Sequence, residues 1–188
     1  MVSFENVTFS YGENKVINNL SFSVSDGKSL LITGASGCGK TTVARLITRL
    51  IAPDSGIVTA PDRISVVFQE DRLIEKLNVY RNICLPLEKS QIPYAESLIS
   101  EFGFQEIKNT AIRTLSGGMK RRVAIIRALA FCGDCLILDE PFNGIDKENA
   151  GKISEIITRE YTNKGKSVII ISHNVSDAAA LNAEVLKL

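Results

Sequence analysis

The sequence lacks any apolar run near the roughly 18 residues of a transmembrane helix, and its N-terminus shows no signal-peptide pattern. It also has almost no net charge, because 22 Lys and Arg residues are balanced by 21 Asp and Glu residues. This balance rules out a strongly basic protein held to nucleic acid mainly by counterion release, although it leaves room for a local basic patch. We therefore expect a cytoplasmic chain that binds no nucleic acid.

Cysteine and histidine are also scarce, with four cysteines and His173 as the only histidine. A secreted disulfide scaffold is shorter and denser in cysteine, which favours a reducing compartment. Cys132 and Cys135 form a single CxxC pair that has too few neighbouring ligands for a zinc site. A redox pair is the weaker alternative, because Cys135 leads straight into an apolar strand. We interpret both residues as structural thiols.

Hydrophobic patterning divides the chain into two parts. Residues 2–24 alternate apolar and polar positions as half-buried strands do, and Asp26-Gly27 is a turn signal consistent with antiparallel pairing there. Continuous apolar runs follow at 29–33, 64–68, 136–138 and 168–171, which is typical of parallel strands covered on both faces. Helical spacing follows the first run, at 43–50, and precedes the last, at 153–161.

The stretch from about Asp71 to Thr114 has a helical pattern, with Tyr94, Leu98 and Phe102 at i, i+4 and i+8. No Pro/Gly/Ser-rich linker splits the chain. We expect one α/β domain over residues 1–188, with a mainly parallel sheet, an N-terminal antiparallel β part and no regulatory domain. A short helical subdomain is expected as an insertion at roughly 71–130.

Residues 34–41 fit the phosphate-binding loop pattern GxxxxGK[ST], between a predicted strand and a predicted helix. Its glycines let backbone N–H groups approach phosphate oxygens, and the helix adds its positive end. Lys40 supplies a charge for the β- and γ-phosphates, and Thr41 a hydroxyl for Mg²⁺. The alternative, a chance match on a glycine turn, does not explain the flanking strand and helix. The predicted nucleotide-binding residues are Gly34, Ala35, Ser36, Gly37, Cys38, Gly39, Lys40, Thr41 and Thr42.

Two acidic residues end the apolar run at 136–138. Asp139 would stand at the carboxyl edge of the sheet, where ligands of α/β proteins bind, and would hold Mg²⁺ through water. Glu140 would lie at the loop mouth and polarise an attacking water molecule. A solvated strand end is the usual explanation for such a pair, but the phosphate-binding loop in the same chain favours the functional one.

A second glycine-rich segment, Leu115-Ser-Gly-Gly-Met119, precedes a predicted helix. A serine and two glycines before a helix can bind an anion, although a plain helix N-cap is the better explanation when the segment is taken alone. The helix carries a basic run that fits either a solvated face or a nucleic-acid patch, formed by Lys120, Arg121, Arg122 and Arg127.

Together these motifs resemble the nucleotide-binding domain of ATP-binding cassette (ABC) proteins, in that family's order and over essentially the whole chain. Residues 34–41 resemble the Walker A loop and residues 136–140 the Walker B motif. Residues 115–119 resemble the signature LSGGQ, with Met119 in place of the usual Gln. The resemblance also points to Tyr11 as the aromatic that stacks on adenine, Gln69 as the Q-loop glutamine, Asp146 as the D-loop aspartate and His173 as the switch histidine.

The resemblance implies an ATPase in which two copies of the domain enclose two ATP molecules head to tail. Its implied catalytic residues are Lys40, Glu140 and His173, and its implied Mg²⁺ ligands are Thr41, Gln69 and Asp139. Residues supplied in trans by the other copy would be Ser116, Gly117, Gly118 and Asp146. Taken singly, each of these residues has an ordinary structural explanation, and their joint order favours the family.

Residues 68–73, followed by Asn78-Val and Asn82-Ile, resemble importer ATPases of the nitrate, sulfonate and taurine group. This implies a subunit on the inner face of the cell membrane that contacts transmembrane permease subunits through the Q-loop region. The alternatives are an ABC ATPase of an exporter or of a process other than transport. A monomeric P-loop kinase would have no use for residues 115–119, and a regulatory module would have lost Glu140 or His173.

Overall fold

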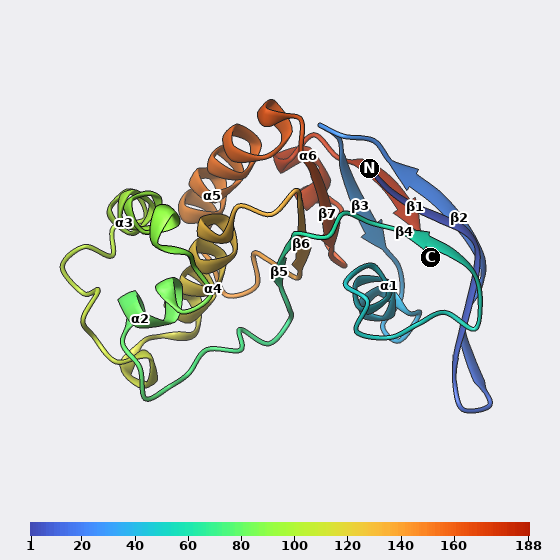
Figure 1. Ribbon diagram of the computed structural model, residues 1–188, viewed down its shortest axis with the longest axis horizontal. Coiled ribbons are helices and arrows are strands. Elements are labelled where there is room, and N and C mark those ends of the chain that lie inside the picture. The colour runs from blue at the N-terminus through green and yellow to red at the C-terminus, as the bar shows by residue number, and fades with distance from the viewer.

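The computed structural model describes residues 1–188, which form two sheets flanked by helices (Figure 1). The antiparallel sheet has the order β2-β1-β4 and consists of β1 (Val2–Tyr11), β2 (Asn14–Val24) and β4 (Ser55–Thr59). The parallel sheet has the order β5-β6-β7-β3-β8 and consists of β3 (Ser29–Thr33), β5 (Ile64–Val67), β6 (Cys135–Asp139), β7 (Ser167–Ile171) and β8 (Glu184–Lys187). The predicted α/β class with an N-terminal antiparallel part is confirmed.

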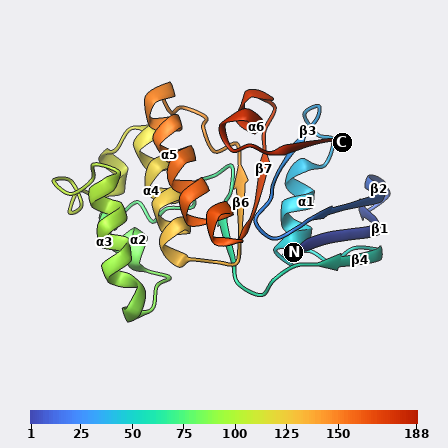
Figure 2. The same cartoon turned by 90° about the horizontal axis from the view of Figure 1, so that it is seen from above.

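Alternate residues of the parallel strands pack into two separate hydrophobic clusters. Leu31, Leu136 and Ile170 belong to the larger cluster, which also contains side chains of α4 (Gly117–Phe131) and α5 (Lys147–Glu160). Their strand neighbours belong to the smaller cluster, with α1 (Lys40–Ile47) and the antiparallel sheet. Figures 1 and 2 show these two groups on opposite sides of the parallel sheet. Burial of both faces explains why these strands are apolar without alternation.

Between β5 and β6 the chain forms helices, apart from one isolated bridge between Asn78 and Ala111. These are α2 (Val79–Cys84), the short 3-10 helices Lys89–Gln91 and Ile112–Thr114, α3 (Ile92–Glu101) and α4. The predicted apolar stripe lies along α3 and ends at its C-cap, Phe102. After β6 the chain continues through α5, a 3-10 helix (Thr162–Lys164), β7, α6 (Ser176–Ala180) and β8. No helix has the length and apolar character needed to cross a bilayer.

Two details of the β structure differ from the sequence prediction. The turn at Asp26-Gly27 exists, but it leads from β2 in the antiparallel sheet to β3 in the parallel sheet. The antiparallel hairpin turns instead at Gly12-Glu13, between β1 and β2. Strand β4 carries no alternating signal because most of its residues are exposed.

Cys132 and Cys135 are both free thiols. Cys135 lies at the start of β6 and is completely buried, and this burial raises its pKa to about 11. Its packing in the smaller hydrophobic cluster agrees with a structural role for this thiol.

A buried pair of hydroxyl groups connects the end of α5 to β5. The Tyr161 hydroxyl donates to Ser65 Oγ at 2.8 Å, and Ser65 Oγ also accepts from the Gly133 amide at 3.0 Å. We expect Tyr161→Phe to lower the free energy of unfolding by about 1 kcal/mol, because one buried hydrogen bond is lost. Urea denaturation measures this change. The control Tyr80→Phe, which removes a surface hydroxyl 3.3 Å from Glu96, should change stability little, and equal losses would contradict the prediction.

Candidate active site

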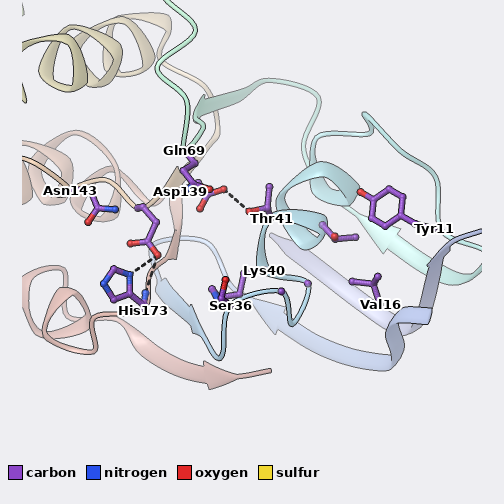
Figure 3. A pocket seen from close by; sticks show the side chains of 13 residues that line it. Tyr11, Val16, Ser36, Lys40, Thr41, Gln69, Asp139, Asn143 and His173 are labelled. Carbon is purple, nitrogen blue, oxygen red and sulfur yellow. Dashed lines mark hydrogen bonds and ion pairs between the residues drawn. The ribbon is translucent and has the colours of Figure 1, made fainter. Parts of the chain in front are cut away.

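A cleft of about 560 Å³ opens where the parallel strands end. Loops after β3, β5, β6 and β7 all reach it, as expected when the carboxyl ends of parallel strands meet at one edge. It is lined by Tyr11, Val16, Ser36, Gly37, Gly39, Lys40, Thr41, Thr42, Gln69, Asp139, Glu140, Asn143 and His173 (Figure 3).

The loop between β3 and α1 wraps tightly at its glycines. Gly39, the N-cap of α1, has a φ of 105°, and a Cβ there would lie 2.7 Å from Ile17 Cδ1. A side chain is therefore excluded both by the backbone conformation and by the neighbouring strand β2. The Lys40 ammonium donates to the carbonyls of Gly34 at 2.9 Å and Ala35 at 2.8 Å, so it folds back over its own loop.

Asp139 and Thr41 bring oxygen atoms together at the base of the cleft. Asp139 ends β6 with an exposed fraction of 2%, and Thr41 Oγ1 donates to its Oδ2 at 3.0 Å. Burial raises the pKa of Asp139, and the Thr41 hydrogen bond opposes that rise. Gln69, just after β5, lines the same cleft. A hydroxyl, an amide and one carboxylate suit Mg²⁺, which keeps several waters and substrate oxygens rather than an all-protein cage.

Glu140 and His173 form a polar wall of the cleft. His173 Nδ1 lies 2.9 Å from Glu140 Oε1, and the His173 backbone amide donates to the same oxygen at 3.1 Å. The hydrogen bond to Glu140 raises the pKa of His173 because the carboxylate stabilises the imidazolium. Glu140 has a φ of 50°, an uncommon conformation for a residue with a Cβ, and its amide donates to Ile171 O at 2.7 Å.

The aromatic end of the cleft lies away from this wall. Figure 3 shows Tyr11 and Val16 at the opposite end from Asn143 and His173. Tyr11 ends β1 and is 43% exposed, while its hydroxyl accepts a hydrogen bond from Arg45 Nη1 at 3.0 Å. This bond orients the ring without covering it, which leaves an aromatic face available for a ligand.

Several predicted residues lie outside the cleft. Gly34 and Ala35 contribute the carbonyls that hold Lys40, and Cys38 Sγ lies 3.9 Å from the Lys40 ammonium. The four residues predicted to act in trans also do not line it: Ser116, Gly117, Gly118 and Asp146.

Within this chain, Ser116 and Asp146 serve as helix caps. Ser116 caps α4 by accepting from the Met119 amide at 3.3 Å, and Asp146 caps α5 by accepting from Asn149 at 2.9 Å. The two segments touch, since a Cβ on Gly118 would lie 2.4 Å from the Gly144 carbonyl oxygen. The second glycine-rich segment is thus preformed, and it lies outside the cleft of its own chain.

Sequence reasoning missed two cleft residues. Val16 packs beside the loop glycine Gly39, and no pattern indicates that a strand of the other sheet reaches this point. Asn143 lies just beyond the acidic strand end, where its position relative to Glu140 and Pro141 was a usable signal.

The three arginines of the basic run on α4 bond to the protein's own backbone, unlike a fully solvated face. Arg121 is buried, with an exposed fraction of 4%, and is bonded to loops beside the cleft. Arg122 donates to the carbonyl of Phe102, and Arg127 donates to that of Asp71 at 2.7 Å. Their guanidinium groups connect α4 to backbone carbonyls of other segments.

Comparison with known proteins places this site in context. Residues 17–143 match the family described as ABC transporter. The chain is 34% identical over 182 residues to the aliphatic sulfonates import ATP-binding protein SsuB 1 of Shouchella clausii, covering 96% of this chain and 74% of that protein. It is 30% identical over 186 residues to the taurine import ATP-binding protein TauB of Roseobacter denitrificans, and the match covers 92% of this chain and 69% of that protein. The solved structure of a dimeric ATP-binding cassette in a post-hydrolysis state, bound to ADP and Pi, superimposes on this chain with a TM-score of 0.90 at 26% identity. The match covers 100% of this chain and 94% of that chain.

The pairing of Glu140 with the only histidine can be tested directly. Because the carboxylate raises the pKa of His173, we expect Glu140→Gln to lower that pKa. An NMR titration of the single imidazole measures it without ambiguity. The control Glu101→Gln removes a carboxylate that pairs with Arg159 on the surface and should leave the titration unchanged. An unaltered pKa in the Glu140 variant would contradict the pairing.

Proposed function

This chain belongs to the ABC transporter family and is one of its ATPases, and we propose that it powers an importer as one half of a head-to-tail dimer. The separation of its two phosphate-binding loops carries the proposal. Lys40, Asp139 and Glu140 share one cleft, whereas residues 116–118 lie outside it. A second copy in a closed symmetric pair supplies those residues to the cleft. In this proposal residues 1–188 are one nucleotide-binding domain, and residues 71–130 are its helical subdomain.

Binding of ATP is assigned to the loop and to the aromatic end. Tyr11 stacks on adenine, with its ring oriented by Arg45. The amides of residues 34–42 and the Lys40 ammonium surround the phosphates. The ammonium has to leave the carbonyls of Gly34 and Ala35 to do so, and phosphate oxygens replace them as its partners.

Thr41, Gln69 and Asp139 are the residues that would hold Mg²⁺, which neutralises charge on the β- and γ-phosphate oxygens when bound. The Thr41 hydroxyl lies 3.0 Å from the Asp139 carboxylate, so two of these three residues are already adjacent. Because burial raises the pKa of Asp139, a nearby positive charge also relieves the cost of ionising that carboxyl group.

Glu140 accepts the proton of the attacking water. Its Oε1 is held by the amide and ring of His173, whereas Oε2 has only a long contact from Ser172 Oγ at 3.4 Å. Oε2 is therefore the oxygen free to orient water. His173, with an exposed side chain at the cleft, contacts the γ-phosphate and helps to stabilise its charge.

Import, and docking to a membrane permease, are supported by two observations. The relatives named above are import ATP-binding proteins. Downstream of Gln69, Ile74 is 44% exposed and Leu85 is 64% exposed, so two large apolar side chains are available for contact with a partner. Buried Asn82 holds the backbone of Ile74 through both of its polar groups. We place the protein at the inner face of the cell membrane, with permease subunits bound here.

Replacing the proposed base should separate binding from hydrolysis. We expect Glu140→Gln to lower turnover by on the order of 100-fold or more, because an amide does not accept the proton of water. Nucleotide affinity, measured with a fluorescent ATP analogue, should stay near that of the wild type. The Glu101→Gln protein is the matched control. Turnover that survives in the Glu140 variant would contradict its role.

Dimerisation should appear in the dependence of activity on protein concentration. We expect the specific activity of Mg-ATP hydrolysis to rise with concentration, because each site needs residues from a second chain. Size-exclusion chromatography with and without ATP gives the oligomeric state. A flat, appreciable specific activity from a chain that elutes as a monomer would mean that one chain holds a whole site.

A further inference from the structure

Arg121 is the most completely buried cation of the chain and lies one turn into α4. Its guanidinium donates to Asp71 Oδ1 at 3.0 Å, which is its only carboxylate partner. Its other acceptors are five backbone carbonyls: those of Phe68, Gln69, Asp139, Glu140 and Pro141. A buried charge is costly unless all of its donors are satisfied, so this concentration of acceptors is what keeps the side chain in place.

The five carbonyls belong to two segments, which follow neighbouring strands. Strands β5 and β6 pair in register up to Val67 and Leu138, and the ladder between them ends there. Phe68 and Asp139 are the next residues on each side, and Arg121 bonds to both of their carbonyls. The planar fork of a guanidinium, with five N–H donors, replaces the missing ladder and fixes the distance between the two strand ends.

Both segments carry residues of the active site. The first contains Gln69, and the second contains Asp139 and Glu140. Glu140 has a positive φ, a conformation that persists only when the surroundings hold it. Its amide is held by Ile171 O at 2.7 Å, and its carbonyl accepts from Arg121 Nη2 at 3.0 Å and from the Asn143 amide at 3.4 Å. Removing the guanidinium takes away the shorter of the two hydrogen bonds to this carbonyl.

We infer that Arg121 is a positioning residue for hydrolysis, which fixes Gln69 and Glu140 relative to each other. It does not line the cleft, so it acts through their backbones rather than on the substrate. Because α4 begins at Gly117, the same side chain connects both catalytic segments to the loop proposed to meet the partner's ATP. The inference rests on the proposed function for its kinetic consequence.

The next residue along α4 offers a matched control. Arg122 is half-buried, with its guanidinium over the ring of Phe104 at 4.9 Å to the centroid, and it donates to the Phe102 carbonyl. It makes no hydrogen bond to residues 68–71 or 139–141. Its loss should cost stability without moving the catalytic segments.

The experiment compares Arg121→Gln, Arg121→Lys and Arg122→Gln in kcat, KM, ATP affinity and amide hydrogen exchange. We expect Arg121→Gln to lower kcat by about 10- to 100-fold while ATP affinity stays within about threefold, because misplaced groups impair chemistry more than binding. Exchange should rise at residues 68–71 and 139–143 above the rise elsewhere. Arg121→Lys, with one ammonium for two segments, should be intermediate.

An unchanged kcat in Arg121→Gln would overturn the inference, and so would an equal fall in Arg122→Gln or a uniform rise in exchange. If Arg121→Gln does not fold, the Arg121→Lys protein provides the test. A wild-type kcat and wild-type hydrogen exchange in Arg121→Lys would show that the planar guanidinium is not needed, and would overturn the inference. A wild-type protein without turnover would count against the proposed function instead, and the exchange data would still test the contact.

Discussion

Parallel pairing of β5, β6, β7 and β3 is the constraint on which the site depends. It sends four strand ends to one edge of the sheet, and each of them continues into a loop that lines the cleft. Lys40, Gln69, Asp139 and His173 are separated by tens of residues in the chain and meet there for this reason alone. The helices and the antiparallel sheet bury the two faces, so the sheet can hold these loops rigidly.

A sheet edge built this way collects unsatisfied polar groups, and the structure satisfies them with few side chains. Thr41 takes up one oxygen of buried Asp139, and His173 takes up one oxygen of Glu140. The carbonyls left free where β5 and β6 diverge are taken up by Arg121. Each of these contacts links segments that are distant in sequence, so the site is a network rather than a set of separate motifs.

Local patterns predicted the elements that carry the chemistry. Continuous apolar runs indicated the core parallel strands, and the glycine-rich loop with Lys40 indicated the phosphate-binding turn before α1. A strand buried on both faces needs consecutive apolar residues, and a tight loop needs glycines, so both features are visible in a few neighbouring residues. The Asp26-Gly27 turn was identified in the same way, from local backbone preference. Its partner strands were not, since a turn residue carries no information about which sheet the chain enters next.

The chain's residue order therefore determined the loop, the acidic strand end and the caps at Ser116 and Asp146, which depend on contacts a few residues apart. Three-dimensional packing decided that Val16 and Asn143 reach the cleft, that residues 116–118 lie outside it and that Arg121 is buried. A basic run on a helix looks the same in sequence whether water or carbonyl groups surround it. The acceptors that offset the free-energy cost of burying the Arg121 charge lie 18 to 53 positions away in the chain, and only folding brings them to it.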